Sequence, residues 1–105
     1  MTIIMILVTI RMKVSPEKRL ELSQTISLLS GPIRMAKGCR RCDFFQSVED
    51  ENQLFLVEEW ETREKLIIHQ RSEHFRVLRG ATNLLEEPYE MTFYTAYHPE
   101  GIEAI

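Results

Sequence analysis

The sequence predicts an α+β domain of the ferredoxin-like type, with the element order β-α-β-β-α-β and a second helix that is split. Three observations lead to this prediction: strand-like segments near both ends of the chain, a polar turn that joins two further strand-like segments, and helix-start signals between them. This order gives a four-stranded antiparallel sheet that carries its helices on one face.

The first strand is expected at residues 3–13 and is apolar on both faces in its first half. One face carries Ile4, Ile6, Val8, Ile10 and Met12, and the other carries Ile3, Met5 and Leu7 before it becomes polar. A strand of this kind must be covered on both faces, because apolar side chains are exposed to water wherever either face stays bare.

The first helix is expected to begin at Ser15-Pro16-Glu17. The serine can cap, the proline suits the first helical position, and the glutamate favours the positive end of the helix dipole. Apolar residues then recur at helical spacing. Gly31-Pro32 is expected to end or kink this helix, and Gly38 is expected to form a left-handed turn after it.

The second half of the chain predicts a hairpin, two short helices and a last strand. The hairpin consists of residues 39–48 and 53–61, which are joined by a polar turn. Thr62 and Ser72 are the expected caps of the two helices. The last strand is expected at residues 89–97, after a proline that stops the second of these helices.

We expect residues 1–97 to form one domain and residues 98–105 to form a C-terminal tail without clear periodicity. The chain has 105 residues, of which 44% are hydrophobic and 28% are charged, as is usual for one globular domain. A chain this short buries only a modest fraction of its surface, so association with a second copy would help to stabilise it.

The predicted arrangement implies a homodimer through the sheet. Helices on one face leave the opposite face bare, and that face would expose Ile3, Met5, Leu7 and aromatic residues of the last strand. Two sheets packed face to face would cover both apolar surfaces. We therefore expect a symmetric dimer in which the two open sheet faces meet.

Composition argues against nucleic acid and membranes as partners. The net charge is -3, whereas binding to phosphates requires a basic face. The apolar N-terminal run is too short to span a bilayer, and it lacks the basic flank and cleavage site of a secretory signal. We therefore expect a cytoplasmic location.

Cys39 and Cys42 form a C-x-x-C sequence at the start of a predicted strand. Residues three apart on a regular strand point to opposite faces, so we expect two free thiols that neither form a disulfide nor bind a metal. The three histidines also lack carboxylate or cysteine partners at ligand spacing. The sequence thus predicts no metal and no cofactor.

Two segments resemble the antibiotic biosynthesis monooxygenase family. The first runs from Gly31-Pro32-Ile33-Arg34 to the strand Phe44-Phe45-Gln46-Ser47. The second joins Val57-Glu58-Glu59-Trp60 to His69-Gln70-Arg71-Ser72-Glu73-His74-Phe75, which is similar to the H-x-x-S-x-H-F pattern of that family. With the strand order, the resemblance covers roughly residues 3–97.

The resemblance implies a dimeric α/β barrel with a cavity between sheet and helices in each subunit. Some members oxidise electron-rich aromatics such as quinols or anthrones with O2, without metal or flavin, and related members degrade haem or act on small signalling metabolites. The haem-degrading relatives use an asparagine of the first strand, which is absent here. Their tryptophan and histidine positions fall on His69 and Arg79, which disfavours haem degradation.

Cofactor-free oxygenation requires a base, a dry pocket and donors that hold the developing charge. His69 is the candidate base, and it should point to the sheet because it follows Leu66 by three residues. Glu58 and Glu59 lie on opposite strand faces, so one carboxylate is partly buried and either orients the base or pairs with a basic residue. Trp60 shares the face of Glu58. The predicted catalytic residues are His69, Glu58 and Trp60.

The predicted substrate-binding residues are Phe75, His74, Tyr94 and Phe45. Structural roles in the core or at a helix start are the alternative for each of these aromatic side chains. The leading hypothesis is a cofactor-independent monooxygenase-like enzyme for a small phenol or quinol. Its rival is a non-catalytic homodimeric module that binds a small ligand or only assembles. A cavity bordered by His69 would favour the enzyme, and a filled interior would favour the module.

Overall fold

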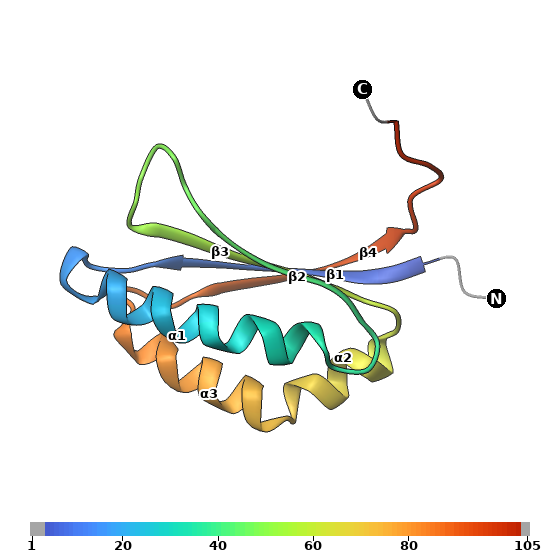
Figure 1. Ribbon diagram of the computed structural model, residues 1–105, viewed down its shortest axis with the longest axis horizontal. Coiled ribbons are helices and arrows are strands. Elements are labelled where there is room, and N and C mark those ends of the chain that lie inside the picture. The colour runs from blue at the N-terminus through green and yellow to red at the C-terminus, as the bar shows by residue number, and fades with distance from the viewer. Residues whose placement is uncertain (1–3, 104–105) are drawn as a thin grey trace.

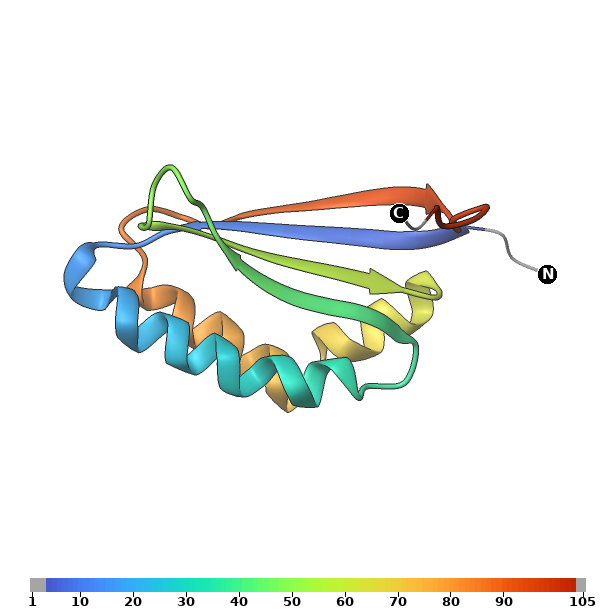
Figure 2. The same ribbon diagram turned by 45° about the horizontal axis from the view of Figure 1, so that its top comes forward.

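A computed structural model of the chain describes residues 4–103 and confirms the predicted α+β fold. The split second helix is present, so the order of elements is β-α-β-β-α-α-β. The four strands form one antiparallel sheet in the order β2-β3-β1-β4, and the helices cover one of its faces (Figures 1 and 2). The elements are β1 (Ile4–Lys13), α1 (Pro16–Arg34), β2 (Cys39–Gln46), β3 (Gln53–Trp60), α2 (Arg63–Gln70), α3 (Glu73–Ala81), the 3-10 turn η1 (Thr82–Leu84) and β4 (Glu90–Tyr97).

The core lies between the sheet and the helices, and β1 at the centre of the sheet supplies much of it. The alternate apolar residues predicted for the inner face of β1 are buried from Ile6 to Met12, while Ile4 is 37% exposed. Ile3 lies outside the described residues. Further buried side chains of the same cluster come from α1, β2, β3, α2 and α3: Leu22, Ile26, Leu29, Ile33, Cys42, Leu54, Leu56, Trp60, Leu66, Phe75 and Leu78.

Helix α1 continues through the position at which the sequence predicted an end or a kink. Pro32 lies inside the helix, which ends at Arg34. A proline removes only one backbone donor there, and the last turn is held by other contacts. Ile33 is buried, and the guanidinium of Arg34 donates from Nε (3.0 Å) and Nη2 (2.6 Å) to the carbonyl of Cys42. Ser15 occupies the N-cap position, but its side chain makes no cap hydrogen bond.

The turn between α1 and β2 depends on Gly38, as the sequence predicted. Gly38 has φ 89°, in the left-handed region that disfavours side chains. A Cβ placed on Gly38 would overlap the Cβ and Cγ atoms of Lys65 on α2. Both the backbone conformation and the close approach of a neighbouring helix therefore require glycine here.

Replacing Gly38 by alanine is expected to destabilise the protein by about 1–3 kcal/mol, the usual cost of a strained backbone conformation. Thermal unfolding followed by circular dichroism measures this loss. Gly80→Ala is the matched control, because Gly80 lies at the end of α3 with nothing within 4 Å of an added Cβ. Equal melting temperatures for the two variants would contradict the assigned role of the turn.

A β-bulge corrects the expected directions of the two cysteines. Cys39 pairs with Trp60 and Cys42 pairs with Glu58, and the register shifts between Cys39 and Arg41. Trp60 and Glu58 share the inner face of β3, so both cysteines also lie on that face. The prediction of opposite faces is wrong because the extra residue of the bulge changes the alternation.

The cysteines are free thiols in the structure, and burial changes their acidity. Desolvation raises the pKa of Cys39 to about 11 and the pKa of the fully buried Cys42 to about 12. Both groups are therefore protonated near neutral pH, and the thiolate that reacts with disulfides or binds metals is scarce.

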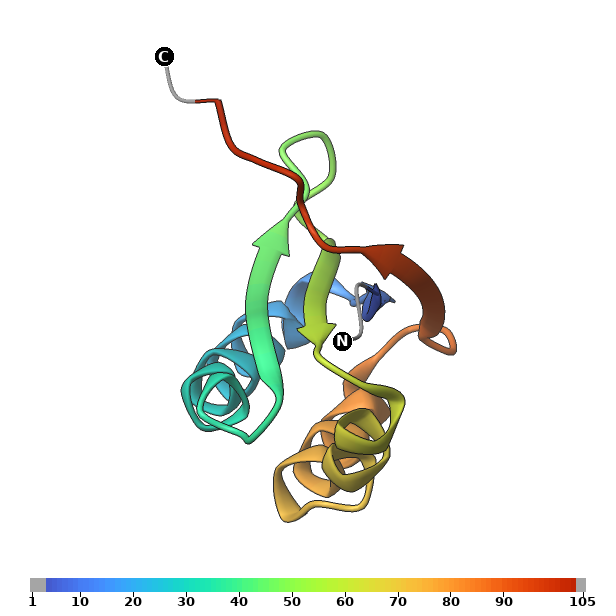
Figure 3. The ribbon, with the colours of Figure 1, turned by 90° about the vertical axis from the view of Figure 1, so that its right-hand side faces the viewer.

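The sheet face opposite the helices carries the aromatic residues Phe45, Phe55 and Tyr94. Tyr94 pairs with Leu7 and Phe45 pairs with Phe55, and these positions alternate with the inner-face residues. Tyr94 is 48% exposed and Phe45 is 44% exposed. The β2–β3 loop and the segment after β4 both project to the side of the sheet away from the helices (Figures 1 and 3). This side is therefore a broad surface with a projection at each end.

Candidate active site

Strand β3 places a carboxylate and an indole side by side on the inner face of the sheet. Glu58 and Trp60 are two residues apart, and both are 0% exposed. The Nε1 atom of Trp60 donates to Oε1 of Glu58 over 2.8 Å. This bond satisfies the only polar atom of the indole and one oxygen of a carboxyl group that water cannot reach.

Helix α2 brings His69 to this pair. Thr62 caps the helix by accepting from the backbone N–H of Lys65, and Leu66 and His69 form its buried face. The predicted inward direction of His69 is confirmed, because the residue is 3% exposed. Its ring stacks on Trp60, with centroids 4.6 Å apart and planes at 23°, and meets the edge of Phe75 at 5.4 Å.

Two polar atoms of the cluster have no hydrogen-bond partner among residues 4–103. They are Nε2 of His69 and Oε2 of Glu58. Nε2 of His69 lies 3.7 Å from Oε1 of Glu58, which is beyond hydrogen-bond distance. An unsatisfied buried polar group costs about 1–3 kcal/mol, and such groups are rare unless they have a role.

Burial shifts the pKa values of Glu58 and His69 in opposite directions. Desolvation raises the pKa of the Glu58 carboxyl, and the hydrogen bond from Trp60 offsets only part of this effect. Desolvation also lowers the pKa of His69 to about 4, with a smaller contribution from the nearby His74. The imidazole is uncharged at neutral pH, and Glu58 is a stronger base than an ordinary carboxylate.

The lowered pKa of His69 makes stability depend on pH. The folded chain keeps this imidazole neutral down to a pKa of about 4, while the unfolded chain protonates it near 6.5. Its contribution to stability is therefore present above pH 6.5 and lost as the pH falls towards 4. Glu58 acts in the opposite sense, because its raised pKa lets the folded state take up a proton first.

We expect the stability advantage of the wild type over His69→Gln to shrink by about 2 kcal/mol between pH 7.5 and pH 5. Urea unfolding of both proteins at the two pH values measures this change. An advantage that does not depend on pH would show that the folded state protonates His69 as readily as the unfolded chain.

A pocket of about 170 Å³ opens beside His69. This volume lies below the range of about 300–1,000 Å³ that is typical for drug-sized ligands, so it suits a single-ring compound better than a fused-ring one. A cavity bordered by His69 is the feature expected of an enzyme, so this pocket favours the enzyme hypothesis over the non-catalytic module. Its lining residues are Ala36, Lys37, Trp60, Lys65, Ile68, His69, Ser72 and His74.

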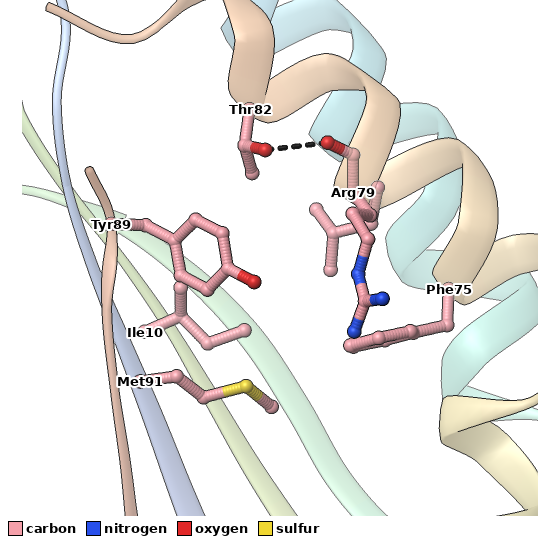
Figure 4. A pocket seen from close by; sticks show the side chains of 7 residues that line it. Ile10, Phe75, Arg79, Thr82, Tyr89 and Met91 are labelled. Carbon is pink, nitrogen blue, oxygen red and sulfur yellow. Dashed lines mark hydrogen bonds between the residues drawn. The ribbon is translucent and has the colours of Figure 1, made fainter. Parts of the chain in front are cut away.

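The space between the sheet and α3 is almost filled. An apolar cavity there has a volume of about 10 Å³, which is at most the size of one water molecule. Figure 4 shows Tyr89 and Met91 facing Phe75 and Arg79 across it. The guanidinium of Arg79 lies 5.1 Å above the ring of Phe75. A substrate-sized cavity is therefore absent at this position among the described residues.

The structure brings the three predicted catalytic residues together. Of the four predicted substrate-binding residues, two lie near this cluster and two lie on the other face of the sheet. Phe75 packs beneath His69, and His74 is exposed at the pocket. Tyr94 and Phe45 lie on the opposite sheet face, so they do not line the pocket of their own chain. Sequence reasoning missed Lys37 and Lys65, although Lys65 precedes His69 by one helical turn and so shares its face.

No group of three or more histidine, cysteine, aspartate or glutamate side chains within residues 4–103 could hold a metal ion. In the same part of the chain, no helix is long and apolar enough to cross a membrane.

Fold and site together define a ferredoxin-like α+β domain with a small pocket beside a buried Glu-Trp-His cluster. The chain belongs to the family "Antibiotic biosynthesis monooxygenase", whose profile matches residues 5–81. It is similar to "Putative monooxygenase YcnE" of Bacillus subtilis (strain 168), with 30% identity over 89 residues that cover 83% of this chain and 93% of that protein.

Solved structures share the fold over nearly the whole chain. Rv0793 from Mycobacterium tuberculosis is 26% identical with a TM-score of 0.85, and the match covers 92% of this chain and 99% of that one. A conserved protein from Methanosarcina mazei Go1 is 27% identical with a TM-score of 0.83, over 88% of this chain and 92% of that one.

Proposed function

We propose that this protein is a cofactor-independent monooxygenase-like enzyme that oxidises a small single-ring phenol or quinol with O2. The observation that carries the proposal is the buried pair of His69 and Glu58 beside a pocket that His69 lines, in which Nε2 of His69 and Oε2 of Glu58 lack hydrogen-bond partners among residues 4–103. The name of the relative YcnE agrees with this class of reaction.

The first step is removal of the phenol proton. Nε2 of His69 faces Glu58, so the other edge of the ring is available to a ligand in the pocket that His69 lines. The imidazole accepts the phenol proton at Nδ1 and passes its Nε2 proton to the Glu58 carboxylate. The gap of 3.7 Å closes to hydrogen-bond distance when the ligand binds, as happens for many catalytic pairs.

The resulting phenolate is electron-rich enough to reduce O2. One electron passes to O2, and the radical pair combines to form a carbon–oxygen bond at the ring position para to the phenolate. The proton on that carbon then passes to the distal peroxide oxygen as the O–O bond breaks, which leaves the second carbonyl and a hydroxide. A phenol with a free para position and one O2 thus give one para-quinone and one water, with no other reductant. The protonated dyad returns its proton to the leaving hydroxide.

Oxygen uptake with a panel of single-ring phenols and quinols tests the proposal. We expect one O2 consumed for each quinone formed from a phenol, with one atom of ¹⁸O2 in the product and the other in water. Formation of hydrogen peroxide without incorporation of label would indicate a simple oxidase. Uptake no faster than without enzyme, across the whole panel, would contradict the proposed reaction.

The rival function is a non-catalytic module that binds a small ligand. The almost filled space between the sheet and α3 favours it, because a larger substrate has no room there. Saturable ligand binding at the His69 pocket without oxygen uptake would support this function over catalysis.

We also propose that the chain forms a homodimer through the open face of its sheet. The face carries the exposed aromatic rings of Tyr94 and Phe45, and large exposed apolar residues also occur on the two projections beside it. Val48, in the β2–β3 loop, and Ile102, after β4, are both more than 90% exposed. A second sheet laid on this face, with both projections around it, would remove these side chains from water.

A further inference from the structure

We propose that the His69 pocket selects ligands that carry an anionic group, and specifically single-ring aromatic carboxylates. This inference rests on the proposed function for the location of the site, and it names the chemical class of the substrate. It is carried by positive charges around the pocket that form no ion pair within residues 4–103.

The residues that line the pocket are basic or neutral. Lys37, Lys65 and His74 contribute the charged or ionisable groups at its rim, and no lining residue is acidic. Ion pairs within residues 4–103 involve Arg19, Arg41, Arg76 and His69, but neither lysine of the pocket has a carboxylate oxygen within 4 Å. The two ammonium groups therefore lack a counter-charge in this part of the chain.

The fold holds these two lysines near each other. Lys37 directly precedes Gly38, and the Cβ and Cγ atoms of Lys65 pack against the space where a side chain of Gly38 would lie. Like charges brought together in this way repel each other, and an anion bound between them relieves the repulsion. The tight turn at Gly38 thus assembles a cationic rim from two distant parts of the sequence.

The rest of the pocket suits an aromatic ring. Trp60, His69 and Ile68 provide flat or apolar walls. Ser72 accepts the backbone N–H of Phe75 at its Oγ, so its hydroxyl proton is available as a further donor. A ring lying on these walls would place a carboxylate at the lysines, and the volume of about 170 Å³ limits the ligand to a single ring.

The fluorescence of Trp60 tests the inference without any need for turnover, because it is the only tryptophan of the chain. We expect 3-hydroxybenzoate, whose position para to the hydroxyl is free, to bind at least about 10-fold more tightly than the neutral 3-hydroxybenzamide at low ionic strength, with a preference that falls as salt is added. The double variant Lys37→Met/Lys65→Met should lose this preference and keep the weaker affinity for the amide, and the corresponding arginine variant should retain it.

Lys18→Met is the matched control, because Lys18 is an exposed lysine in the first turn of α1 and is not among the lining residues. Equal affinity for the acid and the amide, an unchanged preference in the double methionine variant, or no binding of either compound at 10 mM would overturn the inference. Tight binding of the acid without oxygen uptake would support the preference for anionic ligands and contradict the proposed reaction. Oxidation of neutral phenols in preference to acids would support the proposed reaction and contradict the preference for anionic ligands.

Discussion

His69→Ala is expected to lower turnover by about 100-fold or more, which is the usual effect of losing a general acid–base group. The imidazole is the only ionisable side chain of the buried cluster that also lines the pocket, so its removal separates Glu58 from the ligand. Initial rates of oxygen uptake with the most rapidly oxidised phenol of the panel measure the effect. The same measurement for Glu58→Gln should also show a large loss, because the relay then lacks its final acceptor.

A structural role alone would change stability and leave the chemistry intact, so the controls must separate the two. His98→Ala removes a histidine that lies after β4 and outside the pocket, and it should retain full turnover. Circular dichroism should show that His69→Ala remains folded. Its affinity for 3-hydroxybenzoate should fall far less than its turnover. A folded His69→Ala variant with wild-type turnover would remove His69 from the mechanism.

Tyr94→Asp is expected to raise the dissociation constant of the proposed homodimer by 100-fold or more, because an unpaired charge buried at an interface costs about 3–5 kcal/mol. Tyr94 is 48% exposed in the single chain, so the substitution should leave the fold of each protomer intact. Met5 lies on the same sheet face but is only 7% exposed, and a charge there would disturb folding as well as association.

Light scattering and sedimentation at a series of concentrations measure the dimer. Leu20→Asp is the matched control, since Leu20 is an apolar residue of α1 that is 70% exposed and lies on an element at the other face of the sheet. It should leave the dissociation constant unchanged. A wild-type protein that is a folded monomer at micromolar concentration would refute the dimer, and an equal response of both variants would refute its location.

The site shows which inferences need only local sequence. Two residues on one strand share a face at every second position, so Glu58 and Trp60 were paired correctly from their spacing. His69 follows Leu66 by three residues on a capped helix, and its inward direction was likewise predictable. The side chains of Thr62 and Ser72 cap their helices as expected, because capping depends on a backbone N–H only three residues away.

Other features depend on contacts between distant segments, and the sequence alone left them open or wrong. The strand alternation could not say whether Glu58 or Glu59 is buried, because that depends on which sheet face the helices cover. The bulge in β2 places Cys39 and Cys42 on the same face instead of the expected opposite faces, since one extra residue changes every later side-chain direction relative to the partner strand.

The sequence by itself determined the order of the elements, most of their boundaries and, for most strands and helices, which side chains share a face. These properties depend on periodicity, capping and turn chemistry, which act over a few residues. The tertiary structure alone decided that the pKa of His69 is lowered by burial, that Lys37 and Lys65 meet at one pocket, and that Tyr94 and Phe45 lie on the opposite face from it. Desolvation and the approach of charges depend on which segments pack together in space, and a local pattern does not record this.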